Sequence, residues 1–427
     1  MHRTLIKDIA EFEEKELTIK GRILFRRELG NVTFLVIQDY TGTLQTVWDS
    51  SVEAKVGETV SCTGLLKKEV RAKGGFELHG KTCELLSGNK EDLPFDISSP
   101  KLNLQLTTLL DNRTLSLRHP RIQAIFKLYD LLLEGYEQVM RTHGFTEIKT
   151  PKLLGAASEG GANFFKLGYF DTHAYLAQSP QLYKQIMVGV FERVFEVGSV
   201  FRAEPHFTTR HVNEYIGLDA EFGFIDNFTD VTAMLNNVLR EVFLYVKEKG
   251  SEYAALYDVQ VPEVPEKIPQ VKLSEIKKII KEKYGYEVPA DTDIDPEGER
   301  MAGRYAKEEF GSDFIFLTHY PWRDRPFYTM PDSENPDETC SYDLLMCGME
   351  IVTGSQRIHN YDQLIENMQK KGVKPEGLEF YLDTFKYAMP PHGGWGMGSE
   401  RLIQQMLGLK SIKEAVLFPR DVKRLAP

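Results

Sequence analysis

The chain has 427 residues, of which 42% are hydrophobic and 27% charged, and its net charge of −11 argues against a broad basic surface for nucleic acid. No run of about 18 apolar residues and no apolar N-terminal stretch is present, so the sequence predicts neither a membrane span nor a secretory signal. The four cysteines form no CxxC pair, which predicts neither a zinc site nor disulfides and favours a cytoplasmic location.

Residues 1–88 are predicted to form an N-terminal β-barrel domain. Five short runs rich in β-branched and aromatic residues lie between about 13 and 88, separated by turns such as Gly30-Asn31. Five strands in so short a segment favour an OB-fold. Lysine and arginine side chains in these runs suit a phosphate backbone, although a solvated barrel surface is the more ordinary explanation of the same residues.

A polar segment with two prolines, 89–115, predicts a linker between domains. Apolar residues at helical spacing then predict a long amphipathic helix over about 119–143. We expect residues 116–427 to form one α+β domain of mainly antiparallel strands flanked by helices. Within it, residues 255–312 are rich in Lys, Glu and Pro and are predicted to form a helical insertion, with Ser274 as a helix cap. We expect this insertion to have no role in the chemistry.

The segment 194–225 predicts two strands joined by a charged loop. Residues two apart share a strand face, so Arg202 lies with Glu204, and Asp219 lies with Glu221. The opposite face of the second strand is predicted to pack in the core, through Leu218, Ala220, Phe222 and Phe224. A strand pair with one solvated face is the alternative.

Near the C-terminus, Gly394, Gly396 and Gly398 alternate, which lets a backbone or ligand approach closely. Ser399 is a predicted helix cap, and Arg401 lies in the first turn, where an arginine suggests a neighbouring anion. The helix turns apolar residues toward the core, namely Leu402, Ile403, Met406 and Leu407. A packed strand–helix junction explains the glycines equally well.

Eight charged residues occur in apolar contexts, namely Arg202, Glu204, Asp219, Glu221, Asp343, Glu350, Arg357 and Arg401. Burying them unpaired would cost several kcal/mol each, on the order of the whole stability of a domain, so we expect them to line a site for a highly charged ligand. Arg357 or Mg²⁺ would balance the carboxylates among them. No GxxxxGK[ST] loop is present, which excludes a P-loop nucleotide site.

Three segments in order resemble the signature motifs of the class II aminoacyl-tRNA synthetases of the aspartyl/asparaginyl/lysyl subclass. Residues 144–154 are similar to motif 1, 201–221 to motif 2 and 393–401 to motif 3, and the resemblance covers nearly the full length. Within the subclass the chain is most similar to the archaeal and eukaryotic aspartyl type, through the segments ASEGGANFF, AQSPQLYKQ, EIVTGSQRIH and LFPRD.

The resemblance implies an enzyme that uses ATP, Mg²⁺, L-aspartate and tRNA, with Arg202, Arg401 and Lys184 as its catalytic residues. ATP would contact Arg202, Glu204, Arg210, His211, Tyr215, Glu350 and Arg401. Aspartate would contact Glu159, Gln181, Lys184, Asp219, Thr353 and Arg357. Mg²⁺ would bind Asp343, Glu350 and Thr353. The resemblance also implies a homodimer built through motif 1.

Two cations, Lys184 and Arg357, at one substrate carboxylate favour aspartate, because asparagine would leave them uncompensated in a dry pocket. An asparagine-specific ligase stays the second hypothesis. A paralogue outside translation, such as an amide synthetase or an RNA-binding regulator, is the third, although the arginines of motifs 2 and 3 and the N-terminal module are all present.

The resemblance further implies that the N-terminal module reads the tRNA anticodon through Phe34, Gln45 and Glu77. Family members often carry tryptophan where this chain has Arg22. That departure leaves open whether the enzyme separates the aspartate tRNA from the asparagine tRNA.

Overall fold

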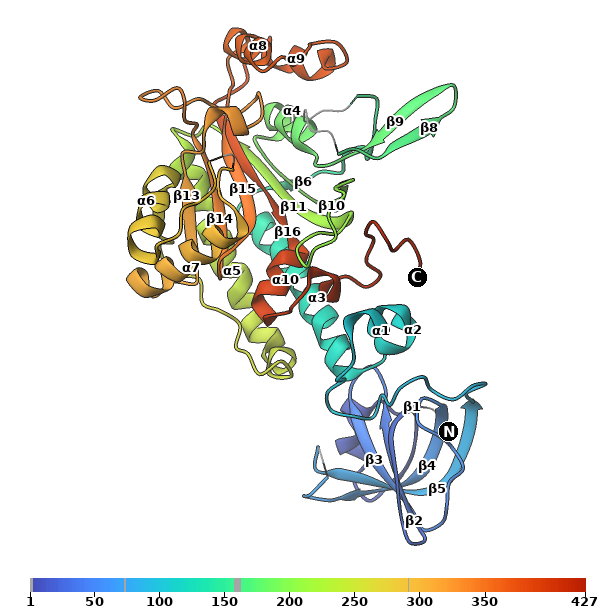
Figure 1. Ribbon diagram of the computed structural model, residues 1–427. Helices are drawn as coiled ribbons and strands as arrows, with labels where there is room; N and C mark the ends of the chain where they lie inside the picture. Colours follow the sequence, from blue (N-terminus) through green and yellow to red (C-terminus); the bar gives the residue numbers. More distant parts are fainter. Residues whose placement is uncertain (1–2, 73, 157–162, 291) are drawn as a thin grey trace. The chain divides into compact units, whose positions relative to one another are not determined.

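The computed structural model describes residues 3–72, 74–156, 163–290 and 292–427 (Figure 1). The chain divides into two compact units, Met1–Pro120 and Arg121–Pro427. Among the described residues, no helix is long and apolar enough to cross a membrane.

The first unit is a closed five-stranded barrel with strand order β1-β2-β3-β5-β4, which confirms the predicted OB-fold. Alternate residues point inward, so Leu35 and Ile37 of β2 are buried between more exposed neighbours. The strands are β1 (Glu16–Leu29), β2 (Val32–Gln38), β3 (Thr43–Trp48), β4 (Thr59–Lys68) and β5 (Phe76–Ser87). A short helix precedes them and two follow, namely η1 (Ile6–Phe12), α1 (Leu106–Asp111) and α2 (Arg113–Ser116).

The second unit is built on an eight-stranded sheet of order β12-β13-β14-β15-β16-β11-β10-β6, which confirms the predicted α+β class. Neighbours are antiparallel except for the β10–β6 and β12–β13 pairs. The strands are β6 (Thr146–Glu147), β10 (Arg193–Phe201), β11 (Glu214–Gly223), β12 (Gln270–Lys272), β13 (Phe314–Thr318), β14 (Ser341–Met346), β15 (Met349–Arg357) and β16 (His392–Gly398).

Helices cover this sheet through separate apolar cores. The largest core joins the sheet to α3 (Pro120–Thr142), α5 (Phe228–Ala255) and α10 (Ser399–Leu407). The bounds of α3 confirm the predicted amphipathic helix. A second core packs α6 (Leu273–Tyr284) and α7 (Pro296–Phe310) on β13 and β14, and a third contains α4 (Gln181–Phe191), α8 (Tyr361–Lys370) and α9 (Glu379–Phe385).

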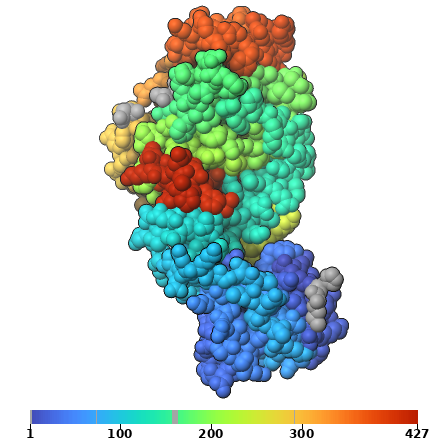
Figure 2. Space-filling model, turned by 90° about the vertical axis from the view of Figure 1, so that its right-hand side faces the viewer, coloured from blue at the N-terminus to red at the C-terminus, as the bar shows by residue number. Residues whose placement is uncertain are grey.

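The smaller elements complete the second unit. A three-stranded sheet contains β7 (Leu153–Leu154), β8 (Lys166–Tyr169) and β9 (Thr172–Leu176), and its β8–β9 hairpin projects from the body in Figure 1. Two short 3₁₀ helices are η2 (Trp322–Asp324) and η3 (Ile412–Ala415). The C-terminal segment lies on the surface of this unit (Figure 2), where the carbonyl of Arg420 accepts a hydrogen bond from the Asn213 N–H.

Several local predictions need correction. Arg202 and Glu204 lie in the loop after β10, because strand pairing ends at Phe201 and Pro205 cannot donate to a ladder. Phe224 lies just beyond β11, is 73% exposed and does not join the core.

Both predicted serine caps are also wrong. Ser274 lies inside α6, which begins directly after β12 with Lys272 as its N-cap. Ser399 is the first residue of α10 rather than its cap, and its hydroxyl donates a hydrogen bond to the Ile216 carbonyl at 2.9 Å instead.

Candidate functional site

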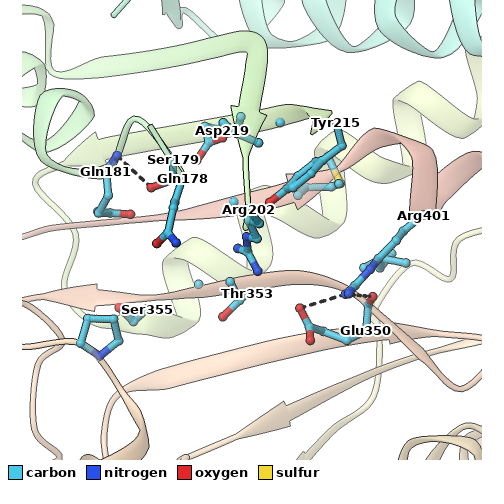
Figure 3. Close-up of a pocket in the computed structure, with 18 of the residues that line it drawn as sticks. Gln178, Ser179, Gln181, Arg202, Tyr215, Asp219, Glu350, Thr353, Ser355 and Arg401 are labelled. Atoms are coloured by element: carbon cyan, nitrogen blue, oxygen red, sulfur yellow. Dashed lines mark hydrogen bonds and ion pairs between the residues drawn. The ribbon is translucent and has the colours of Figure 1, made fainter. Parts of the chain in front are cut away.

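A cavity of about 260 Å³ opens over β11, β15 and β16 in the second unit (Figure 3). It brings together most of the predicted site residues, namely Gln181, Arg202, Glu204, Arg210, His211, Tyr215, Asp219, Glu350, Thr353, Arg357 and Arg401. Lys184 and Asp343 are buried outside this lining, and Glu159 lies outside the described residues.

Glycines in β16 let this strand lie close to β11 and to the carboxylate side chains that β11 carries. A Cβ on Gly394 would lie 2.1 Å from the Ala220 carbonyl oxygen, and one on Gly396 would lie 3.2 Å from Asp219 Oδ1. Any larger residue at Gly394 would therefore push β16 away from β11. This explains the alternating glycines as a close approach between strands and carboxylates.

One end of the cavity combines arginine–glutamate pairs with an aromatic ring. Arg202 Nη1 lies 3.6 Å from Glu204 Oε1, and its guanidinium lies 5.7 Å from the ring centroid of Tyr215. Arg401 Nη1 lies 3.4 Å from Glu350 Oε1 and donates a hydrogen bond to the Glu350 carbonyl at 2.9 Å. In Figure 3, Arg202 and Thr353 face the same space, with Arg401 and Glu350 at one side. A flat, anionic ligand fits these groups.

Glu299 contacts two residues that line this end of the cavity, Arg210 and Glu350, although its segment was expected to have no role in chemistry. It lies in the first turn of α7 and forms an ion pair with Arg210. It also accepts a hydrogen bond from the Glu350 N–H at 3.1 Å. Burial raises the pKa of Glu299, and Arg210 opposes that rise. Nothing in the local sequence separates this glutamate from the solvated acids around it.

The other end holds a buried network of two cations and two carboxylates. Lys184, on α4, has Nζ 2.9 Å from Asp219 Oδ1 and 3.5 Å from Glu221 Oε2, and it donates to the Trp395 carbonyl at 2.7 Å. Arg357 Nε lies 2.8 Å from Glu221 Oε1. Burial would raise the pKa of Glu221, but Arg357 and Lys184 together lower it. Both carboxylates contact Lys184, which confirms the prediction that Asp219 and Glu221 lie on the same face of β11.

These pairs correct one expectation. The sequence predicts Arg357 or Mg²⁺ as the cation beside Asp343 and Glu350 and a charged ligand for the site as a whole, whereas the protein supplies other partners from distant segments. Asp219 and Glu221 meet Lys184 and Arg357, and Asp343 meets Arg325. The cavity is therefore lined by compensated charges, which costs less free energy than unpaired ones.

The predicted magnesium ligands lie on neighbouring strands, where Asp343 of β14 pairs in register with Thr353 of β15. Arg325 donates hydrogen bonds to both side chains. Asp343 Oδ1 is buried without a hydrogen-bond partner, and a carboxylate with a hydroxyl gives the oxygen donors that Mg²⁺ prefers. The donor set therefore fits the ion. Across the described ranges, no three His, Cys, Asp or Glu side chains gather to hold a metal.

In the first unit, the three predicted anticodon-reading residues lie on adjacent strands. Gln45 of β3 pairs with Glu77 of β5, and their side chains share a hydrogen bond of 2.6 Å. Val36 of β2 pairs with Gln45, and Phe34 is two residues from Val36 on the same face. Their neighbours Leu35 and Ile37 point into the barrel, so these three residues belong to its outer face.

Glu400 makes stability depend on pH. It is 3% exposed, accepts hydrogen bonds from the Ile216 N–H and the Tyr129 hydroxyl, and burial raises its pKa from 4.5 to about 7. Between these pH values the unfolded chain releases the proton and the folded chain keeps it, so rising pH lowers stability. Glutamine cannot lose a proton. We therefore expect the unfolding free energy of Glu400→Gln, relative to that of the unmodified chain, to rise by up to about 3 kcal/mol as the pH increases from 4.5 to 7.

Urea unfolding at pH 4.5 and pH 8 measures this difference. Glu366→Gln replaces a glutamate whose side chain is 63% exposed and keeps Glu400, so its difference in unfolding free energy from the unmodified chain should be the same at both pH values. Equal responses of the two variants to pH would contradict the role of Glu400.

The chain is similar to known proteins over its whole length. Residues 105–422 match the family described as tRNA synthetases class II (D, K and N), and residues 17–86 match the OB-fold nucleic acid binding domain. The chain is 41% identical to an aspartate–tRNA(Asp/Asn) ligase of Deinococcus radiodurans, over 100% of this chain and 99% of the relative. It is 38% identical to an aspartate–tRNA(Asp) ligase of Pyrococcus furiosus, over 98% and 97%. The crystal structure of asparaginyl-tRNA synthetase from Pyrococcus horikoshii with asparaginyl-adenylate superposes with a TM-score of 0.92, at 29% identity and full coverage of both chains.

Proposed function

This chain belongs to the class II tRNA synthetases (D, K and N), and we propose that it activates L-aspartate with ATP and transfers it to tRNA. The observation that supports aspartate as the amino-acid substrate is the position of Arg357. Arg357 lines the cavity and donates a hydrogen bond to Gln181, and the buried Lys184 shares the Glu221 carboxylate with it. The names of the bacterial and archaeal relatives support the same substrate.

Asparagine is the second candidate substrate, because the charges at this end balance within the protein. Lys184 and Arg357 already have Asp219 and Glu221 as partners. A neutral side chain would then leave no cation unpaired, and the structural relative holds an asparaginyl-adenylate. Aspartate is preferred because its carboxylate can accept a charge-assisted hydrogen bond from Arg357 at the cavity wall.

In the first step, the substrate carboxylate attacks the α-phosphorus of ATP and pyrophosphate leaves. Positioning and charge neutralisation supply most of the rate, and the step needs no general base. Arg202 would hold the α-phosphate, and Arg210 and His211 the outer phosphates, with Glu299 fixing Arg210. Tyr215 and Arg401 would stack on the adenine, and Glu204 would accept a hydrogen bond from its amino group.

The remaining site residues complete the binding of substrates. Gln181, Asp219 and Glu159 would surround the substrate ammonium. Asp343, Glu350 and Thr353 would hold Mg²⁺, which neutralises phosphate charge when bound. In the second step a terminal ribose hydroxyl of the tRNA attacks the aspartyl carbonyl and AMP leaves.

The resemblance to the family also supports roles for the remaining parts of the chain. Residues 1–88 would bind the anticodon through Phe34, Gln45 and Glu77, 89–115 would be the linker, and 116–427 the catalytic domain with its insertion. Two copies would join through motif 1 and act in the cytoplasm. Light scattering that gives the mass of a single chain would contradict the homodimer.

Charging assays with purified tRNAs test the function. The full chain is incubated with ATP, Mg²⁺ and radiolabelled aspartate or asparagine, and with either the aspartate tRNA or the asparagine tRNA. Charging of the aspartate tRNA with aspartate is the expected result. Charging of both tRNAs with aspartate would define a non-discriminating enzyme, whereas charging with asparagine alone would establish the second candidate.

A further inference from the structure

Arg325 lies between two side chains that the proposed function assigns to magnesium. Its guanidinium donates from Nη2 to Asp343 Oδ2 at 2.8 Å and from Nη1 to Thr353 Oγ1 at 2.8 Å. Arg325 follows η2 directly and also lines the cavity. One arginine from a loop therefore bridges the facing residues of β14 and β15.

The surroundings of Arg325 are largely closed to solvent. The side chains of Arg325 and Asp343 are 13% and 10% exposed, and the guanidinium lies 3.8 Å from the ring centroid of Tyr320. A carboxylate at this depth needs a cation, and the tyrosine ring adds a cation–π contact to that cation. Arg325 is thus part of the architecture of the site.

The pairing is nevertheless incomplete. Arg325 Nε, Asp343 Oδ1 and the Tyr320 hydroxyl are buried and have no hydrogen-bond partner among the residues that the structure describes. A two-pronged arginine–carboxylate pair would use both carboxylate oxygens, but here one oxygen is left for another cation. Buried polar atoms without partners cost free energy, so an incoming ligand can improve this arrangement.

We propose that Arg325 is a positioning residue that competes with the divalent cation for Asp343 and Thr353. This inference rests on the proposed function, which places Mg²⁺ at those oxygens. A guanidinium and a divalent cation repel each other, and a cation on Asp343 Oδ1 would also draw on the carboxylate charge and the Thr353 Oγ1 that Arg325 holds, so binding of one weakens binding of the other. Arg325 keeps Asp343 neutralised until the cation arrives, and so sets the cation concentration at which the site fills.

The binding of Mn²⁺ to the full chain, without ATP or amino acid, tests this competition. Electron paramagnetic resonance of free Mn²⁺ should show Arg325→Gln binding the ion at least tenfold more tightly than the unmodified chain. Arg323→Gln is the matched control, because Arg323 lies two residues away with a side chain 63% exposed, and it should leave the affinity unchanged. Equal or weaker binding by Arg325→Gln overturns the proposal.

Loss of Arg325 also leaves Asp343 without its cation, so the variant should be less stable than the unmodified chain. Thermal denaturation separates the two effects. Competition predicts a larger Mn²⁺-induced rise in Tm for Arg325→Gln, and a variant that stays unfolded in Mn²⁺ contradicts it. Charging of the aspartate tRNA by the unmodified chain is measured in parallel. Normal charging with unaltered Mn²⁺ affinity defeats this inference alone, whereas absent charging defeats the proposed function.

Discussion

Replacing Lys184 by alanine is expected to abolish aspartate-dependent exchange between ATP and pyrophosphate. Lys184 is 1% exposed and contacts Asp219, Glu221 and the Trp395 carbonyl. Its loss leaves Asp219 without its ion pair and Glu221 with Arg357 alone, so an incoming aspartate would meet net negative charge. Breaking a buried pair of this kind also destabilises a protein by about 3–5 kcal/mol.

The control must separate a lost substrate site from a weakened fold. Lys152→Ala breaks another largely buried pair, since Lys152 Nζ lies 2.8 Å from Glu196 Oε1 and the Glu196 side chain is 3% exposed. Thermal denaturation should show destabilisation in both variants, and exchange should survive only in Lys152→Ala. Exchange retained by Lys184→Ala would count against the aspartate assignment.

Arg202→Ala is expected to slow adenylate formation by about 10²–10³ in kcat, the usual effect of losing one donor aimed at developing charge. Arg202→Lys should recover little of that loss, because a lysine cannot replace the planar, two-pronged donor set of an arginine. Single-turnover consumption of ATP in the presence of aspartate measures the rate.

Arg193→Ala is the matched control for this prediction. Arg193 lies at the opposite end of β10, its side chain is 37% exposed, and it donates a hydrogen bond to the His143 carbonyl. Because it lies away from the cavity lining, its loss should leave the rate unchanged. An Arg202→Ala enzyme as fast as the unmodified chain would remove Arg202 from the proposed mechanism.

The elements that the sequence predicts well are those specified by local periodicity. The spacing of Ile125, Leu128 and Leu132 predicts α3 because 3.6-residue periodicity places residues three, four and seven apart on one buried face. The alternation of apolar and charged residues likewise predicts β11, because Leu218 and Asp219 lie on opposite faces of the strand and meet different surroundings. Turn residues between short strands likewise predict the barrel.

Other parts of the site depend on contacts between distant segments and leave little local signal. Arg325 meets Asp343 across 18 residues, and Arg210 meets Glu299 across 89. Which residues form these pairs depends on how the strands and helices pack in three dimensions, and the periodicity of the sequence does not predict that packing. The resemblance located most of the cavity residues through motif positions, but it gave no role to Arg325 or Glu299.

The contact made by Glu299 has a mechanical consequence. Because this carboxylate pairs with Arg210 and also accepts a hydrogen bond from the Glu350 N–H, the α6–α7 layer supports the end of the cavity that Arg210 and Glu350 line. Loosening of that layer, through a change in its own apolar core, would change the position of Arg210 without altering any residue that lines the cavity. Residues of this layer thus act on the shape of the cavity from outside its lining, through the Glu299 side chain.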